Sequence, residues 1–210
     1  MTTVRSAAPD ELLELRGEFP ILERSTYLVS NSLGAMPRAT AARMAEYADT
    51  WNELGVRAWA SEWWDLPIRV GNEVAPLFGA RDGEVAMVPN VSTAQAAVVS
   101  AVKFEAPRNV LVTTELDFPS VRYVYERLAT RFGARLVVVP SDDGITVDQG
   151  RLLEAIDEHT ALVAVSHVLF KSAFVMDAAS ICKRAREVGA LVSLDAYHSV
   201  GVLPVDVHEL

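Results

Sequence analysis

Short apolar runs rich in Val, Leu and Ile alternate with longer amphipathic stretches along most of the chain. The runs have the length of buried β-strands, and they predict strands at 84–88, 110–113, 136–139, 161–165 and 191–194. The stretches between them predict helices at 92–102, 119–132, 148–156 and 177–188. Alternating strands and helices of this kind are typical of an α/β fold, in which helices cover both faces of a mainly parallel sheet.

The chain before residue 80 has a different pattern and is mostly helical. It predicts helices at 9–16, 37–54 and 63–78, and a brief strand at 27–29 that leads into a turn at 31–34. Pro37 suits the first turn of a helix because that position needs no backbone N–H, and Gly79 is a natural stop. We expect an N-terminal helical segment, residues 1–55, followed by a large domain, residues 56–210.

Composition narrows the class of protein. At 210 residues, half of them hydrophobic and 22% charged, the chain can bury a sizeable core. A net charge of −9 without a Lys/Arg cluster argues against a nucleic-acid partner or an anionic membrane surface. The sequence lacks both a run of the ~20 apolar residues that a transmembrane helix needs and the apolar core of a signal peptide. Its single cysteine, Cys182, excludes an internal disulfide, so we expect a cytoplasmic protein.

The last predicted strand ends in an acid, Asp195, and His198 follows in the next turn. Open α/β sheets bind their ligands at the carboxyl ends of the strands. A buried carboxylate there needs a cationic partner or strong donors, because desolvating it unpaired is costly. One candidate partner is the protonated ring nitrogen of pyridoxal phosphate, whose electron sink depends on such an acid. A metal would need more ligands than the one nearby candidate, His167, so we expect none.

Two other strand ends carry residues with functional potential. The sequence Val91-Ser92-Thr93 opens a helix, where amides and hydroxyls can bind a phosphate, although ordinary N-capping explains the same residues. Phe118 follows the next strand and can either stack on a planar ring or act as a hydrophobic staple for the helix behind it. Without further evidence, the staple is the better interpretation of this residue. Lys171, behind a further strand, is better explained as a solvated loop lysine than as a Schiff-base nucleophile.

The order of these features is more informative than any one of them. A phosphate cap, an aromatic residue and an acid follow successive strands, and no dinucleotide fingerprint or nucleophile elbow is present. This order resembles the class V aminotransferase superfamily of fold-type I pyridoxal-phosphate enzymes, and within it the kynureninase family. The resemblance covers nearly the whole chain, in the segments 27–34, 55–59, 64, 79–85, 118–120, 166–168 and 195–201.

The resemblance implies the large domain of the fold-type I transferase fold, and it implies a role for each matching residue. The residues that it assigns to the cofactor are Val91, Ser92, Thr93, Phe118, Ser120, Ser166, Asp195 and His198. The first three hold the phosphate, and Phe118 stacks on the pyridine ring. Asp195 pairs with the ring nitrogen and His198 lies by the phenolic oxygen, which makes these two the expected catalytic residues. Ser32 and Trp64 line the substrate side.

The chain departs from the kynureninase pattern in two places. Val121 stands where kynureninases usually have an Asp after the Phe-Pro-Ser/Thr segment. The Schiff-base lysine of the family falls beyond Leu210, and it is not matched by Lys103, Lys171 or Lys183. We therefore expect the sequence to be the N-terminal portion of a longer protein, with the large domain incomplete.

The activity implied by the resemblance is hydrolysis of the Cβ–Cγ bond of L-kynurenine or 3-hydroxykynurenine to anthranilate and L-alanine, a step of tryptophan catabolism. The expected partner is thus a small amino-acid substrate, and the complete protein is expected to be a homodimer. One alternative is another class V activity, such as an epimerase, a desulfurase or an aminotransferase. Another is a non-catalytic chain that binds the cofactor without a covalent bond or pairs with a second polypeptide.

Overall fold

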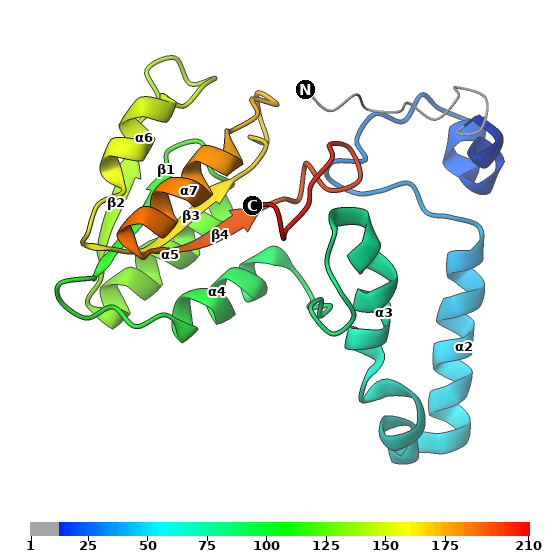
Figure 1. Ribbon diagram of the computed structural model, residues 1–210. Helices are drawn as coiled ribbons and strands as arrows, with labels where there is room; N and C mark the ends of the chain where they lie inside the picture. The colour runs from blue at the N-terminus through cyan, green and yellow to red at the C-terminus, as the bar shows by residue number, and fades with distance from the viewer. Residues whose placement is uncertain (1–12) are drawn as a thin grey trace. The chain divides into compact units, whose positions relative to one another are not determined.

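The computed structural model describes residues 13–210 and divides into two units, one ending at Arg69 and the other running from Val70 to Leu210 (Figure 1). The elements of the first unit are η1 (Leu15–Glu18), η2 (Pro20–Glu23), α2 (Ala39–Leu54), η3 (Gly55–Arg57) and η4 (Trp59–Trp63). Its aromatic side chains cluster around Trp63, on which Tyr47 stacks with ring centroids 4.5 Å apart. The domain division expected after residue 55 stays a prediction.

In the N-terminal region the structure confirms one predicted helix and corrects two other predicted elements. The helix at 9–16 lies largely outside the described residues, whereas the long helix at 37–54 is confirmed as α2. The strand at 27–29 is wrong: the Tyr27 hydroxyl donates to the Leu33 carbonyl and closes a turn, and no strand pairs with this segment in the described chain. The single helix at 63–78 is also wrong. A π-helix ends at Trp63, α3 covers Leu66–Val74 and η5 covers Ala75–Phe78, since proline cannot donate within a helix and favours a new start.

The second unit contains the α/β pattern. Its elements are η5, α4 (Val91–Ala101), β1 (Val110–Thr114), α5 (Pro119–Phe132), β2 (Arg135–Val139), α6 (Gln149–Ala155), β3 (Thr160–Ser166), α7 (Ala178–Val188) and β4 (Leu191–Asp195). From residue 91 onward, every predicted helix and strand is confirmed with small shifts at the ends. The strand at 84–88 is wrong, because this segment has no ladder partner among the described residues.

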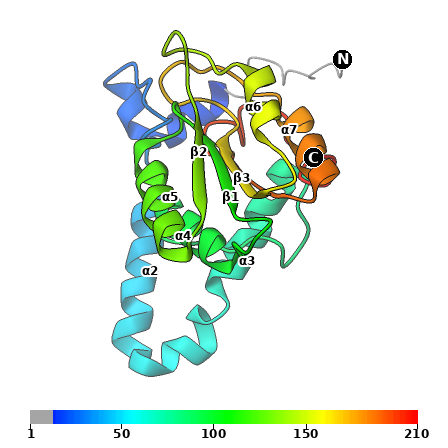
Figure 2. The ribbon, with the colours of Figure 1, turned by 90° about the vertical axis from the view of Figure 1, so that its left-hand side faces the viewer.

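The four strands form one parallel sheet in the order β2-β1-β3-β4. Side chains alternate across it, as the two-residue period of a strand requires. Val110 and Val112 of β1 pack in a core with α6 and α7, whereas Leu111 packs in a second core with α4 and α5. Figure 2 shows these helix pairs on opposite sides of the strands. The expected fold class, a parallel sheet covered on both faces, is confirmed.

Local capping fixes where several helices begin and end. The side chains of Asp148 and Asp177 accept hydrogen bonds from the first turns of α6 and α7. Gly133 and Gly189 end α5 and α7 in the left-handed conformation, with φ of 68° and 74°, which glycine adopts without steric cost. Each of these helices therefore begins or ends at a defined residue. Across residues 13–210, none of the helices combines the length and apolar character needed to span a membrane.

Candidate functional site

The carboxyl ends of the strands meet at one edge of the sheet, with a reversal of winding between β1 and β3. From β1 the chain crosses through α5 to β2 on one side, and from β3 it crosses through α7 to β4 on the other. Ligands of open α/β sheets bind at such a reversal, outside the carboxyl ends of the strands. The loops after β1, β3 and β4 and the start of α4 are therefore where a cofactor site is expected.

The start of α4 has polar groups from several neighbouring residues. Asn90 is the N-cap, and its side-chain oxygen accepts from the Thr93 backbone N–H at 2.9 Å and from the Thr93 hydroxyl at 3.1 Å. The cap is thus supplied by Asn90, which the sequence did not single out. The Ser92 hydroxyl instead donates to the Ser120 hydroxyl at 2.9 Å and so connects the first turns of α4 and α5. Two helix N-termini with adjacent hydroxyls favour negative charge, as the phosphate prediction requires.

Phe118 is the N-cap residue of α5, and 40% of its surface is exposed. Its ring meets that of Phe170, in the loop after β3, edge to face with the centroids 5.1 Å apart. One face of the ring can therefore accept a planar partner. Lys171 is exposed, with its Nζ 5.5 Å from the Phe170 ring, as expected of a loop lysine.

Asp195 ends β4 and is mostly buried. Burial raises the pKa of its carboxyl; the Tyr197 backbone N–H, 3.0 Å from Oδ1, lowers it, nearby Asp117 raises it and His198 lowers it. Ser166 lies directly opposite in the β3–β4 ladder. A mostly buried carboxylate beside a second acid is suited to bind a cation, which the protonated ring nitrogen of pyridoxal phosphate would supply.

Asp117 is the main site residue that the sequence analysis did not single out. Only 3% of its surface is exposed, and its carboxylate accepts hydrogen bonds from the ends of both β1 and β3. The signal was present in the sequence, since Asp117 is an acid shortly after a strand, like Asp195. Tyr125 of α5 lies near both acids: burial raises the pKa of its phenol first of all, and the charges of Asp117 and Asp195 raise it further.

The remaining predicted residues fall in two groups. Val121 is 1% exposed and packs in the core that α4 and α5 form with the sheet, so this position is structural here. Ser32, in a turn, and Trp64, 81% exposed, belong to the first unit. Their role on the substrate side stays a prediction.

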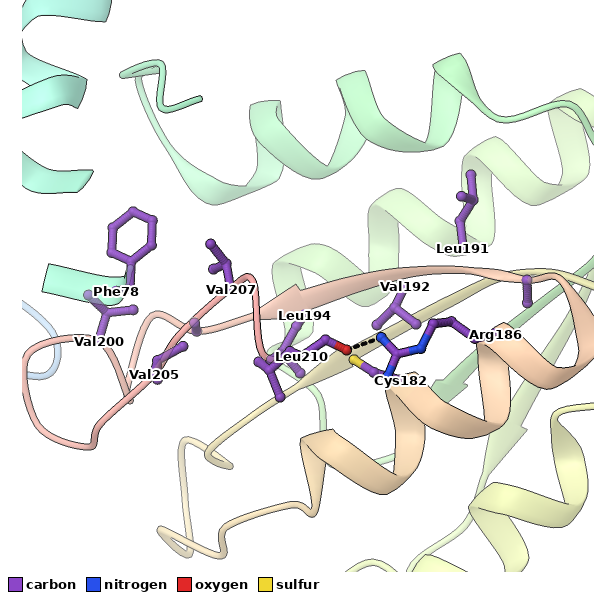
Figure 3. A pocket seen from close by; sticks show the side chains of 12 residues that line it. Phe78, Cys182, Arg186, Leu191, Val192, Leu194, Val200, Val205, Val207 and Leu210 are labelled. Atoms are coloured by element: carbon purple, nitrogen blue, oxygen red, sulfur yellow. Dashed lines mark hydrogen bonds between the residues drawn. The ribbon is translucent and has the colours of Figure 1, made fainter. Parts of the chain in front are cut away.

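An apolar cavity of about 580 Å³ lies elsewhere, between β4, α7 and the segment 200–210 (Figure 3). Cys182 and Arg186 of α7 face it, and the Arg186 guanidinium donates to the Leu210 carbonyl. None of the predicted cofactor residues lines this cavity. Within residues 13–210, β4 pairs with β3 alone, so the cavity borders a strand at the edge of the described sheet.

Comparison with known proteins decides the family. Residues 26–210 match the family model described as aminotransferase class V. The chain belongs to the class V aminotransferase family. The match covers the whole parallel sheet, in agreement with the resemblance recognised from the sequence.

Among curated class V proteins, this chain is 38% identical over 213 residues to a kynureninase of Pseudomonas fluorescens, covering 96% of this chain and 49% of the relative. It is 34% identical over 210 residues to a kynureninase of Burkholderia pseudomallei strain K96243, covering 95% of this chain and 48% of the relative. The similarity to kynureninases expected from the sequence is confirmed. The chain spans about half the length of these relatives.

Solved structures agree on the fold. A mutant of C-DES with glycine covalently linked to its PLP cofactor matches 93% of this class V chain at a TM-score of 0.80 and 22% identity, over 52% of its own length. The apo cysteine desulfurase of Thermococcus onnurineus NA1 matches 99% of the chain at a TM-score of 0.77 and 23% identity, also over 52% of its length. At these identities the likeness concerns the fold.

Proposed function

We propose that this chain forms the cofactor-binding part of a pyridoxal-phosphate-dependent kynureninase. The observation that carries the proposal is the position of Asp195 at the end of β4, mostly buried, opposite Ser166 and near a second acid, Asp117, whose carboxylate accepts from the Ser166 N–H. The anion-binding starts of α4 and α5 support the same cofactor, since its phosphate and its ring nitrogen carry opposite charges. The identity of 38% to a curated kynureninase supports the substrate.

Each residue of the site has a defined task in this proposal. The amides of Val91 and Ser92, with Thr93 beside them, and the hydroxyls of Ser92 and Ser120 would bind the phosphate. Phe118 orients the ring by stacking on its face, a contact that aromatic pairs favour.

The other residues act on the ring itself. Asp195 would hold the proton on the ring nitrogen, with Ser166 beside it, and His198 would lie by the phenolic oxygen. With its nitrogen protonated, the bound cofactor supplies an electron sink for the bonding electrons that leave the substrate. A neutral ring is a poorer sink, so loss of the Asp195 charge is expected to lower the rate by orders of magnitude.

The proposed reaction adds one water to L-kynurenine and breaks its Cβ–Cγ bond. The aryl ketone carbon takes the hydroxyl and leaves as the carboxylate of anthranilate, while the former Cβ takes a proton and becomes the methyl group of L-alanine. Ser32 and Trp64 are proposed to line the aryl side of the substrate. The complete protein is proposed to act as a homodimer.

The direct test uses the protein expressed from its own gene and supplied with pyridoxal phosphate. Incubation with L-kynurenine is expected to release fluorescent anthranilate and alanine in equal amounts. A visible absorption band that borohydride reduces is expected alongside. Absence of anthranilate release with cofactor bound would refute the kynureninase assignment, and absence of cofactor binding would refute the whole proposal.

A second candidate is another class V activity, such as an epimerase, a desulfurase or an aminotransferase, which Val121 in place of the usual Asp leaves open. Supplying L-cysteine and L-alanine in parallel distinguishes these activities. Sulfide release from cysteine would indicate a desulfurase, racemisation of alanine an epimerase, and pyruvate formed in the presence of a keto acid an aminotransferase. A protein that binds the cofactor but acts on none of these substrates would favour the non-catalytic alternative.

A further inference from the structure

Asp117 joins two strands at the candidate site. Its Oδ2 accepts from the Thr113 hydroxyl at 2.9 Å and from the Thr114 N–H and hydroxyl, both at 2.8 Å, at the end of β1. Its Oδ1 accepts from the Ser166 N–H at 2.6 Å, at the end of β3. The carboxylate therefore faces donors on both oxygens, and an ionised carboxylate, which only accepts, satisfies them all.

Asp117 joins β1 and β3 just beyond the point where the direct backbone pairing of these two strands stops. The β1–β3 ladder runs from Val110 to Val112, opposite Val163, whereas the β3–β4 ladder continues to Ser166 opposite Asp195. β1 and β3 thus part at the reversal of winding, where a ligand is expected. Asp117 bridges that gap, so it connects β1 to the strand pair that carries Asp195.

Titratable groups from several neighbouring segments lie near Asp195. Asp117 lies on the β1–α5 loop, Tyr125 on α5, and His198 on the loop that follows Asp195 itself. From β3, the His167 N–H donates to the Asp195 carbonyl at 2.9 Å, and burial lowers the pKa of the His167 ring, which favours its neutral form. The two carboxylates give this end of the site negative charge, which favours a cation there.

We propose that Asp117 is a positioning residue of the cofactor site, which fixes the end of β3 opposite Asp195 and adds a second negative charge near the ring nitrogen. It is not a catalytic residue, because its oxygens are already occupied by the protein's own donors. It precedes the ring-stacking Phe118 directly, so it also fixes where that loop begins. The inference rests on the proposed function and deepens it: with Val121 in the core, Asp117 is the acid that this loop directs at the site.

The test compares Asp117→Asn with a matched control, Glu115→Gln. Glu115 is an exposed acid of the same loop, and its carboxylate accepts from the Ser141 N–H at 2.9 Å, away from β3. The measurement is the dissociation constant of pyridoxal phosphate, followed by visible absorption from pH 5 to 8, for the protein expressed from its own gene. Cofactor affinity falls at acid pH as Asp195 becomes protonated, and this decrease is the acid limb of the profile.

We expect Asp117→Asn to weaken cofactor binding about tenfold or more at pH 7.5, as the loss of a hydrogen bond to a charged group implies. The acid limb is expected to move to lower pH, because removal of the neighbouring charge lowers the pKa of Asp195. Glu115→Gln is expected to change neither. A merely structural role would weaken binding equally at every pH, so an unshifted acid limb overturns the inference, as does an unchanged dissociation constant.

Two further outcomes are decisive. If the unmodified protein does not bind pyridoxal phosphate, the proposed function itself fails, whereas normal binding by both the unmodified protein and Asp117→Asn overturns this inference alone. Where Asp117→Asn does not fold, Thr113→Val removes one donor and keeps the charge. It is expected to weaken binding about threefold with the acid limb unmoved, and unchanged binding would overturn the positioning role.

Discussion

Replacement of Asp195 by Asn separates two effects of this acid: its effect on the stability of the fold and its effect on cofactor binding. The amide has nearly the same shape, and its oxygen can still accept from the Tyr197 N–H, so the local turn is retained. What is lost is a mostly buried negative charge close to Asp117. We expect Asp195→Asn to stabilise the cofactor-free protein at neutral pH and to weaken cofactor binding at the same time.

The sign follows from the raised pKa of Asp195. In the folded protein this carboxyl holds its proton to higher pH than in the unfolded chain, where its pKa is about 3.9. Wild-type stability therefore falls as pH rises through the folded-state pKa, and the variant lacks this loss. Each unit by which a pKa is raised corresponds to about 1.4 kcal/mol. A gain on the order of 1 kcal/mol raises the melting temperature by about 2–4 °C for a protein of this size.

The assay is thermal unfolding of the cofactor-free protein at pH 4 and pH 7. The variant is expected to match the wild type at pH 4 and to exceed it at pH 7. Asp143→Asn is a control of opposite sign, because hydrogen bonds from Thr146 and Ile145 hold the pKa of Asp143 well below its usual range. If Asp195→Asn melts at a lower temperature than the wild type at pH 7, the conclusion that the Asp195 charge destabilises the cofactor-free protein is refuted.

Three further changes test separate parts of the site. Ser92→Ala removes the hydroxyl that joins α4 to α5 and is expected to raise the dissociation constant of pyridoxal phosphate about tenfold. Binding of pyridoxal, which lacks the phosphate, is expected to stay unchanged in the same titration. Phe118→Ala is expected to weaken cofactor binding about threefold to tenfold through lost stacking, with little effect on denaturant unfolding because the ring is partly exposed; a large loss of stability would indicate a core role instead. Val121→Asp is expected to reduce the free energy of unfolding by on the order of 3 kcal/mol at neutral pH, and a stable variant in urea titration would contradict the burial of this position.

Much of the candidate site could be predicted from single strand ends and helix starts. Asp195, Phe118 and Ser92 each follow a strand or begin a helix, and a parallel sheet brings such positions to one edge whatever the strand order. Asp117 was not predicted as a site residue, because its role depends on a hydrogen bond that it accepts from the backbone N–H of Ser166, a residue far away in sequence. The true cap of α4 was missed for a smaller reason, since Asn90, Ser92 and Thr93 can all cap and only backbone geometry selects among them.

The sequence by itself determined the elements whose signals are local. Apolar runs set the strands from Val110 onward, and glycines such as Gly133 and Gly189 set the helix ends, because burial period and backbone conformation are properties of a few consecutive residues. Tertiary structure alone decided the strand order and the fate of the segments at 27–29 and 84–88. A strand exists only when another backbone segment supplies its hydrogen-bond partners. The hydrogen bonds by which Asp117 joins β1 to β3 likewise form only once these two strands lie side by side.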